Sequence, residues 1–221
     1  MVRSKVIAID GPAAAGKSTI AQKVAQMLGY VYIDTGAMYR AVTLKALNQS
    51  IDVEDEETIA KMLQNTTIRL TNDKKVFLDE EDVTEAIRQP IVSQNVSAVS
   101  AHKFVRDELK RRQIEYAKTD NVVMDGRDIG TNVLPDADYK IFVTASVDVR
   151  AKRRYDENLK RNSACDLETL KQEIQMRDEL DSTRKHSPLI KAEDAIVVDT
   201  SDLTIDEVIG AIIQIVKGGE K

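Results

Sequence analysis

Residues 11–18 read Gly11-Pro12-Ala13-Ala14-Ala15-Gly16-Lys17-Ser18, and this stretch decides the fold. Its spacing, two glycines with four residues between them followed by Lys-Ser, is that of a phosphate-binding loop, which follows a strand and opens a helix. A β-rich apolar run precedes it at residues 5–9. A helical pattern follows at 17–28, with apolar positions on one face and a glycine beyond its end: Ile20, Val24, Met27, Leu28 and then Gly29. A strand–helix turn without a ligand is the alternative, and the Lys-Ser pair in register favours phosphate binding.

The chemistry of this loop indicates what it binds. Its glycines let successive backbone N–H groups face a β-phosphate, Lys17 neutralises phosphate charge, and the Ser18 hydroxyl reaches Mg²⁺. The expected ATP-binding residues are Gly11, Pro12, Ala13, Ala14, Ala15, Gly16, Lys17, Ser18 and Thr19. Nucleotide binding alone leaves kinases, GTPase switches and ATPases open.

Five short runs that are apolar on both faces predict buried parallel strands. They cover residues 5–9, 30–33, 121–124, 140–144 and 195–198. Helical patterns separate several of them, so we expect an α/β fold with a P-loop NTPase-type core, in which helices flank a five-stranded parallel sheet. A closing amphipathic helix is expected over residues 204–216, with apolar positions at Ile205, Val208, Ile209, Ile212 and Val216.

Residues 66–97 interrupt the alternation of strands and helices. They show a hairpin pattern around Asn72-Asp73, a further extended stretch at 82–84 and a short helical piece that ends at Pro90. We therefore expect a single domain. Its core covers residues 1–60, 98–148 and 186–217, a small β-containing insert covers about 61–97, and a helical lid covers about 149–170.

Composition excludes several classes of function. The chain has 221 residues, a formal charge of -5, 4% aromatic residues and no tryptophan, which argues against a nucleic-acid partner. Its one cysteine, Cys165, cannot form an internal disulfide, and two histidines supply no metal-ligand pattern. No stretch of about 18 apolar residues occurs, and the N-terminus begins with a strand pattern instead of a signal peptide. We expect a cytoplasmic monomer with no membrane partner.

The second predicted strand leads into Asp34-Thr35-Gly36-Ala37-Met38-Tyr39-Arg40. Open α/β sheets bind ligands at the carboxyl ends of their strands, so this motif brings a hydroxyl, a phenol and a guanidinium to that edge. Arg40 can contact a second phosphate through two N–H groups. The alternative is an ordinary helix start, capped by Asp34 or Thr35, with Arg40 in solvent.

The third predicted strand ends in Asp125-Gly126-Arg127-Asp128-Ile129-Gly130-Thr131. Asp125 resembles the acid that holds Mg²⁺, often through water, at the end of a strand beside a phosphate-binding loop. The alternative is a turn with an exposed ion pair, which contributes only about 0–1 kcal/mol.

A charged stripe continues an apolar one over residues 167–184. Leu167, Leu170 and Ile174 are followed at helical steps by Arg177, Asp181 and Arg184, before Ser187-Pro188 ends the helix. Because unpaired charges are costly to bury, this end of the helix either lines a polar cleft or turns into solvent.

A basic run follows the fourth predicted strand. It consists of Arg150, Lys152, Arg153, Arg154, Lys160 and Arg161. Most such runs are solvated helix faces, but an arginine on a mobile segment can close on a phosphoryl transition state. Arg153 and Arg154 are the candidate lid residues.

The combination of these motifs resembles the bacterial cytidylate kinases of the nucleoside monophosphate kinase family. The resemblance covers nearly the whole chain and includes the insert, Val105-Arg106-Asp107-Glu108-Leu109 and Arg111-Arg112-Gln113. It implies a core sheet, an acceptor-binding region enlarged by the insert and a lid, and ATP- and Mg²⁺-dependent phosphorylation of CMP and dCMP. Position 35 is Thr where some members carry Ser.

The resemblance also implies a role for each matching residue. Arg40, Arg127 and Arg184 would hold the acceptor phosphate, Thr35 and Tyr39 would shape its pocket, Arg177 and Asp181 would meet the ribose, and Ser97, Arg106 and Asp128 would read the base. The expected catalytic residues are Lys17, Arg127, Arg153 and Arg184, and the expected metal residues are Ser18 and Asp125. Base chemistry agrees, since the cytosine amino group needs a carboxylate acceptor, which the uracil carbonyl would leave unpaired.

Two other functions stay open at this point. One is a kinase of another small acceptor, such as UMP or a metabolite alcohol. It would have the same loop, but its acceptor pocket would lack the set Asp128, Arg106 and Ser97. The other is a nucleotide-dependent switch module without an acceptor. It explains the loop only and gives Arg40, Arg127, Arg177 and Arg184 no reason to converge.

Overall fold

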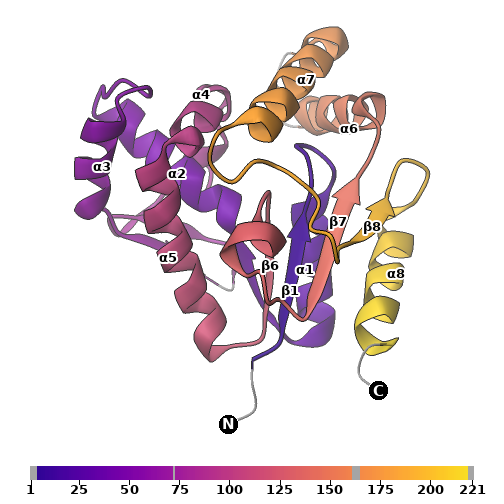
Figure 1. Ribbon diagram of the computed structural model, residues 1–221. Helices are drawn as coiled ribbons and strands as arrows, with labels where there is room; N and C mark the ends of the chain where they lie inside the picture. Colours follow the sequence, from indigo (N-terminus) through magenta and orange to yellow (C-terminus); the bar gives the residue numbers. More distant parts are fainter. Residues whose placement is uncertain (1–3, 72, 161–164, 219–221) are drawn as a thin grey trace.

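The computed structural model describes residues 4–71, 73–160 and 165–218 (Figure 1). Its centre is a parallel sheet whose strands lie in the order β2 (Val31–Asp34), β6 (Val122–Gly126), β1 (Val6–Asp10), β7 (Tyr139–Thr144) and β8 (Ile196–Asp199). This confirms the predicted α/β fold and its five-stranded sheet. Each strand forms within two residues of its predicted bounds.

Burial differs between β1 and β6, inside the sheet, and β8, at one edge of it. Every residue of β1 and β6 is buried, as the apolar pattern predicts. The prediction is wrong for β8, where Ile196 and Val197 are about half exposed. The reason is its position, because β8 lies at the end of the sheet with β7 as its single neighbour.

Helices α1 (Lys17–Leu28) and α8 (Ile205–Gly218) share one hydrophobic core with the sheet. The bounds of α1 are those predicted, but Met27 is 64% exposed, so its predicted place on the buried face is wrong. The buried stripe instead includes Ala21 and Ala25, whose small side chains let the helix pack closely on the strands. Ile205, at the start of α8, is likewise exposed, whereas the other four predicted positions of that helix are buried.

Four further helices form a second group beside the sheet (Figure 1): α2 (Thr35–Asn48), α3 (Glu56–Gln64), α4 (Pro90–Ala101) and α5 (Lys103–Thr119). They enclose two more apolar clusters. The predicted hairpin is confirmed as the antiparallel strands β3 (Ile68–Leu70) and β4 (Val76–Leu78), to which β5 (Glu81–Asp82) adds. Asn72 of the predicted turn lies outside the described residues. The predicted short helical piece is the turn Ala86–Arg88, and Pro90 is the first residue of α4, where its missing N–H is not needed.

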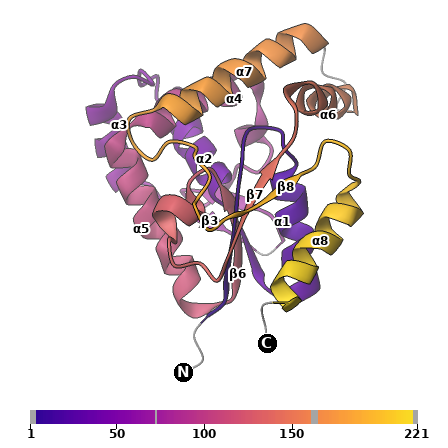
Figure 2. The same cartoon turned by 45° about the vertical axis from the view of Figure 1, so that its right-hand side comes forward.

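Helices α6 (Val147–Lys160) and α7 (Leu167–Thr183) lie over the carboxyl edge of the sheet (Figures 1 and 2). The predicted lid, about 149–170, covers most of α6 and only the first turn of α7, and the division into core, insert and lid stays a prediction. None of the helices in the described part of the chain is long and apolar enough to span a bilayer. At the carboxyl edge of the sheet, beneath α7, the phosphate-binding loop, the start of α2 and the end of β6 meet.

Candidate active site

The phosphate-binding loop has a backbone that requires glycine at two positions. Gly11 has φ +149°, and a Cβ there would lie 1.9 Å from the Val143 carbonyl oxygen of β7, while Gly16 has φ +87°. Ala14 adopts the left-handed region as well, with φ +57°. Lys17 is buried and donates a hydrogen bond to the Pro12 carbonyl at 2.7 Å. Burial and the nearby Arg127 hold the Lys17 pKa well below its usual value.

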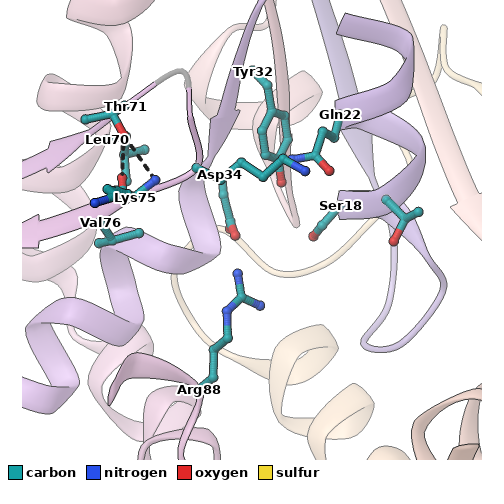
Figure 3. Close-up of a pocket in the computed structure, with 11 residues that line it drawn as sticks. Ser18, Gln22, Tyr32, Asp34, Leu70, Thr71, Lys75, Val76 and Arg88 are labelled. Atoms are coloured by element: carbon teal, nitrogen blue, oxygen red, sulfur yellow. Dashed lines mark hydrogen bonds between the residues drawn. The ribbon is translucent and has the colours of Figure 1, made fainter. Parts of the chain in front are cut away.

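The two residues predicted to meet Mg²⁺ lie together. The Ser18 hydroxyl donates to Asp125 Oδ2 at 2.9 Å, and the Tyr32 hydroxyl donates to Asp125 Oδ1 at 2.8 Å. Burial, followed by the neighbouring Asp34, raises the Asp125 pKa to about 6. Ser18, Tyr32 and Asp34 line a cleft of about 200 Å³. Figure 3 shows Ser18 and Tyr32 on one side of it, Thr71, Lys75 and Val76 on the other, and Asp34 and Arg88 between them.

This donor set fits a hydrated magnesium ion. In the described part of the chain no group of three or more His, Cys, Asp or Glu residues could hold a metal. Mg²⁺ needs no such cage, because it keeps several waters and uses one or two carboxylates plus substrate phosphates. Tyr32 was missed by sequence reasoning, although alternation along β2 places it on the same face as Asp34.

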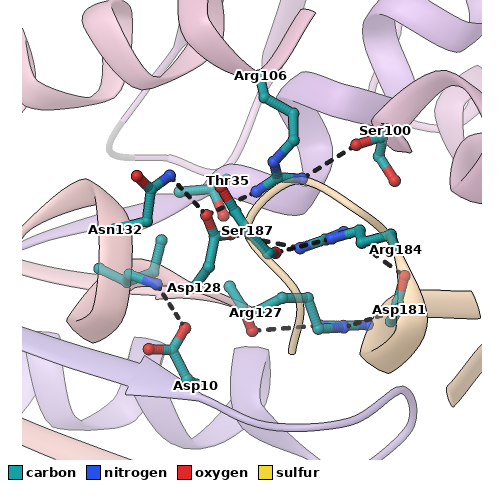
Figure 4. A network of polar contacts seen from close by, with 12 residues as sticks. Asp10, Thr35, Ser100, Arg106, Arg127, Asp128, Asn132, Asp181, Arg184 and Ser187 are labelled. Atoms are coloured by element: carbon teal, nitrogen blue, oxygen red, sulfur yellow. Dashed lines mark hydrogen bonds and ion pairs between the residues drawn. The ribbon is translucent and has the colours of Figure 1, made fainter. Parts of the chain in front are cut away.

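Arginines from three elements converge at the carboxyl edge (Figure 4). Arg127 Nε donates to Asp181 Oδ2 at 3.0 Å, and Arg184 Nη1 lies 3.7 Å from Asp181 Oδ1. Arg40 Nη2 donates to Asp34 Oδ2 at 3.0 Å, so the alternative that Arg40 lies in solvent is wrong. The predicted cap is also formed, because Asp34 Oδ1 accepts from the Ala37 N–H at 2.8 Å.

Several guanidinium donors in this cluster are buried and unsatisfied. Arg40 Nε, Arg177 Nε and Arg184 Nη2 have no hydrogen-bond partner among the residues that the structure describes. Burial, followed by repulsion from Arg127, lowers the Arg177 pKa to about 10. Because unpaired buried donors are costly, these atoms are suited to an anion that supplies several acceptor oxygens. Asp181 is buried as well, so the charged stripe of α7 lines a polar site, one of its two predicted placements.

A second polar group surrounds Asp128. Arg106 Nη2 lies 2.6 Å from Asp128 Oδ2, to which Asn132 Nδ2 also donates at 2.9 Å. Asp128 Oδ1 has a longer contact, 3.6 Å to Arg184 Nη2. Asp128 is buried and pairs with Arg106, while Arg127 pairs with Asp181, so the exposed ion pair considered for this turn is wrong.

Three other predicted substrate residues, Tyr39, Thr35 and Ser97, differ in their contacts. The Arg106 guanidinium lies 5.4 Å from the centre of the Tyr39 ring, and burial raises the Tyr39 pKa to about 12. The Thr35 hydroxyl donates to the Asp125 carbonyl at 2.7 Å and thereby joins the ends of β2 and β6. Ser97 is half-buried on α4, where its carbonyl accepts from the Ser100 hydroxyl at 3.0 Å.

The basic run divides into residues with different surroundings. Arg150 is buried, donates to the Ala13 carbonyl at 3.0 Å and lies 2.6 Å from Asp178 Oδ2, so it ties α6 to the loop and to α7. Sequence reasoning missed this role because the residue lies in a run that is typical of a solvated face. Arg153 donates to the Thr200 hydroxyl and carbonyl at 2.9 and 2.6 Å. Arg154 lies 4.0 Å from Glu157, and Arg161 is outside the described residues.

Comparison with known proteins agrees with this arrangement. A solved structure of an uncharacterized protein from Eubacterium ventriosum ATCC 27560 has a similar fold, with a TM-score of 0.50 at 14% identity over 97% of this chain and 99% of that one. A protein of Bacillus cereus (strain B4264) named cytidylate kinase is 55% identical over 215 residues, 96% of each chain. One with the same name from Bacillus thuringiensis (strain Al Hakam) is 54% identical over the same share. The family model described as cytidylate kinase matches residues 7–218. With the loop, the arginine cluster and the Asp128 group in place, the chain belongs to the cytidylate kinase family.

Proposed function

We propose that this protein transfers the γ-phosphoryl group of ATP to the phosphate of CMP, and of dCMP, to give the nucleoside diphosphate and ADP. The observation that carries this proposal is the set of buried arginine donors that have no hydrogen-bond partner among the described residues and lie beside a phosphate-binding loop. A phosphate monoester supplies the charge and the acceptor oxygens that these donors lack.

On the donor side, the loop residues 11–19 would hold the ATP phosphates. Lys17 would move from the Pro12 carbonyl to the β- and γ-phosphate oxygens. Ser18 and Asp125 would hold Mg²⁺, directly or through water, and the ion would neutralise phosphate charge when bound.

On the acceptor side, Arg40, Arg127 and Arg184 would hold the CMP phosphate, and Arg177 and Asp181 would meet the ribose. Asp128 Oδ1 would accept from the cytosine amino group, because its contact with Arg184 Nη2, at 3.6 Å, is longer than a hydrogen bond and leaves this oxygen able to accept one. Arg106 and Ser97 would supply donors to the other base atoms, and Thr35 and Tyr39 would close the pocket.

Positioning and charge supply the catalysis. A CMP phosphate oxygen attacks the γ-phosphorus in line. The bond between the γ-phosphorus and the oxygen that bridges it to the β-phosphorus breaks, and its electron pair leaves with ADP. The attacking oxygen is already ionised near neutral pH, so no side chain needs to accept a proton. Lys17, Arg127 and Arg184 would stabilise the charge on the transferred group, joined by Arg153 once the lid closes.

A coupled assay of ADP formation with CMP, dCMP, UMP, AMP, GMP and no acceptor tests the proposal. We expect turnover to be concentrated on CMP and dCMP and to require added Mg²⁺. Hydrolysis that is independent of the acceptor would support a nucleotide switch instead, and turnover concentrated on another acceptor would support a different kinase. The cytoplasmic location and the monomeric state stay predictions, to be checked by fractionation and by light scattering.

A further inference from the structure

Asp10 is a buried carboxylate that the proposed mechanism leaves without a role. It is the last residue of β1, directly before Gly11 of the phosphate-binding loop, and is 6% exposed. Its Oδ1 accepts from the Ile129 N–H at 2.8 Å, and its Oδ2 accepts from the Gly130 N–H at 2.8 Å. Figure 4 shows it beside the turn that carries Arg127 and Asp128.

These two N–H groups belong to the residues that directly follow Asp128. The turn is closed from its other end, because the Asp128 carbonyl accepts from the Asn132 and Val133 N–H groups at 2.9 and 3.1 Å. The Asp128 side chain is then held by Asn132 and Arg106. Asp10 therefore fixes the base of a turn whose first residues face the acceptor site.

Only a carboxylate can accept both N–H groups, one on each of its oxygens. An amide has one acceptor oxygen, and its NH₂ group would face the second N–H. Keeping the charge here is unfavourable, because burial outweighs the two hydrogen bonds and raises the Asp10 pKa to about 6. A costly group that directly precedes the phosphate-binding loop and is held by two main-chain N–H groups of the Arg127-Asp128 turn indicates a need for fixed position.

We propose that Asp10 is a positioning residue that sets the Arg127-Asp128 turn relative to the phosphate-binding loop and thereby determines how well the acceptor nucleotide binds. The inference rests on the proposed function, in which Arg127 and Asp128 contact CMP. Asp10 also interacts electrostatically with Lys17, so its substitution could act on the donor side, and the test must separate the two effects.

The test compares Asp10→Asn with Asp138→Asn in the full-length kinase. Asp138 is a matched control because its Oδ2 accepts a backbone N–H, that of Val6, at the opposite end of β1. We expect Asp10→Asn to raise the KM for CMP about tenfold, the effect of losing one hydrogen bond to a charged group, and to change the KM for ATP by less than about twofold. We expect the control to change neither KM.

Amide hydrogen exchange gives a readout that does not depend on activity. The Ile129 and Gly130 amides should exchange faster in Asp10→Asn than in the control, and Asp10→Ala should increase the effect. An unchanged KM for CMP with unchanged protection of both amides would overturn the inference, and so would a change confined to kcat and the KM for ATP, which would place the effect on Lys17. If wild-type enzyme showed no preference for CMP, the proposed function would fail, whereas the exchange result would still report on the turn.

Discussion

Replacing Asp128 with asparagine changes one oxygen of a buried side chain and leaves its shape intact. Oδ2 lies against two donors, Arg106 Nη2 at 2.6 Å and Asn132 Nδ2 at 2.9 Å, so the asparagine oxygen must take that position. Its NH₂ group then replaces Oδ1, the atom that we assign to the cytosine amino group. The variant would present a donor where CMP also presents a donor and where UMP presents a carbonyl.

The magnitude follows from the hydrogen bonds exchanged. CMP loses a bond to a charged group, worth about 1.5–3 kcal/mol, and UMP gains a neutral one, worth about 0.5–1.5 kcal/mol. The preference for CMP over UMP should therefore weaken by about 2–4.5 kcal/mol, so the ratio of kcat/KM for CMP to that for UMP should fall about 30- to 2,000-fold.

The coupled assay, run with each acceptor at saturating ATP, measures this ratio. Asp181→Asn is the control, because it removes a buried carboxylate whose partners are Arg127 and Arg184, whereas the short contacts of Asp128 are with Arg106 and Asn132. We expect it to weaken CMP and UMP alike. If Asp128→Asn left the ratio unchanged, or if both variants shifted it equally, Asp128 would have no role in reading the base.

Three further predictions concern the donor side. Lys17→Ala should lower kcat by about 10²–10³-fold or more while the circular dichroism spectrum stays that of the wild type, because the substitution removes one hydrogen bond, to the Pro12 carbonyl, together with a buried charge that is costly in the folded state. An unfolded spectrum would contradict this reasoning. The raised Asp125 pKa means that the folded state keeps a proton that the unfolded chain releases, so the contribution of Asp125 to stability should fall by about 3 kcal/mol as pH rises from about 4 to about 6. Asp125→Asn should lack that part of the pH dependence in urea titrations, and equal pH dependence in both proteins would refute the reasoning. Ala14→Gly should raise the free energy of unfolding by up to about 1 kcal/mol, because removing the strain of a positive φ at alanine outweighs the added entropy of the unfolded chain. A lower denaturant midpoint would count against that reasoning.

The sheet and the loop were predictable because local sequence determines them. Runs that are apolar on both faces mark the strands, and the glycine spacing of residues 11–16 matches a backbone with positive φ at both glycines. Burial on the helices was less predictable. The stripe of α1 includes two alanines, so Met27 lies outside it, although an apolar pattern counts it as core.

The site was predictable at the level of motifs and not of contacts. Arg127, Arg184 and Asp181 could each be selected from spacing, and the structure brings them together. Asp10 could not be selected, because its partners Ile129 and Gly130 are more than 100 residues away and contribute only main-chain N–H groups. Arg150 was hidden by its basic neighbours for a similar reason, since its contacts with Ala13 and Asp178 exist only in the folded chain.

The strand order has a consequence for how the chain folds. Val6 of β1 pairs with Val122, 116 positions later, and Ile7 pairs with Tyr139, 132 positions later. The other early strand, β2, pairs only with β6, so neither N-terminal strand has a sheet partner until β6 has been synthesised. Pairings so distant along the chain must close long loops before they gain hydrogen bonds, which makes folding slow. On the ribosome, the segment that will bind ATP must therefore wait, unpaired, for more than half of the protein to emerge.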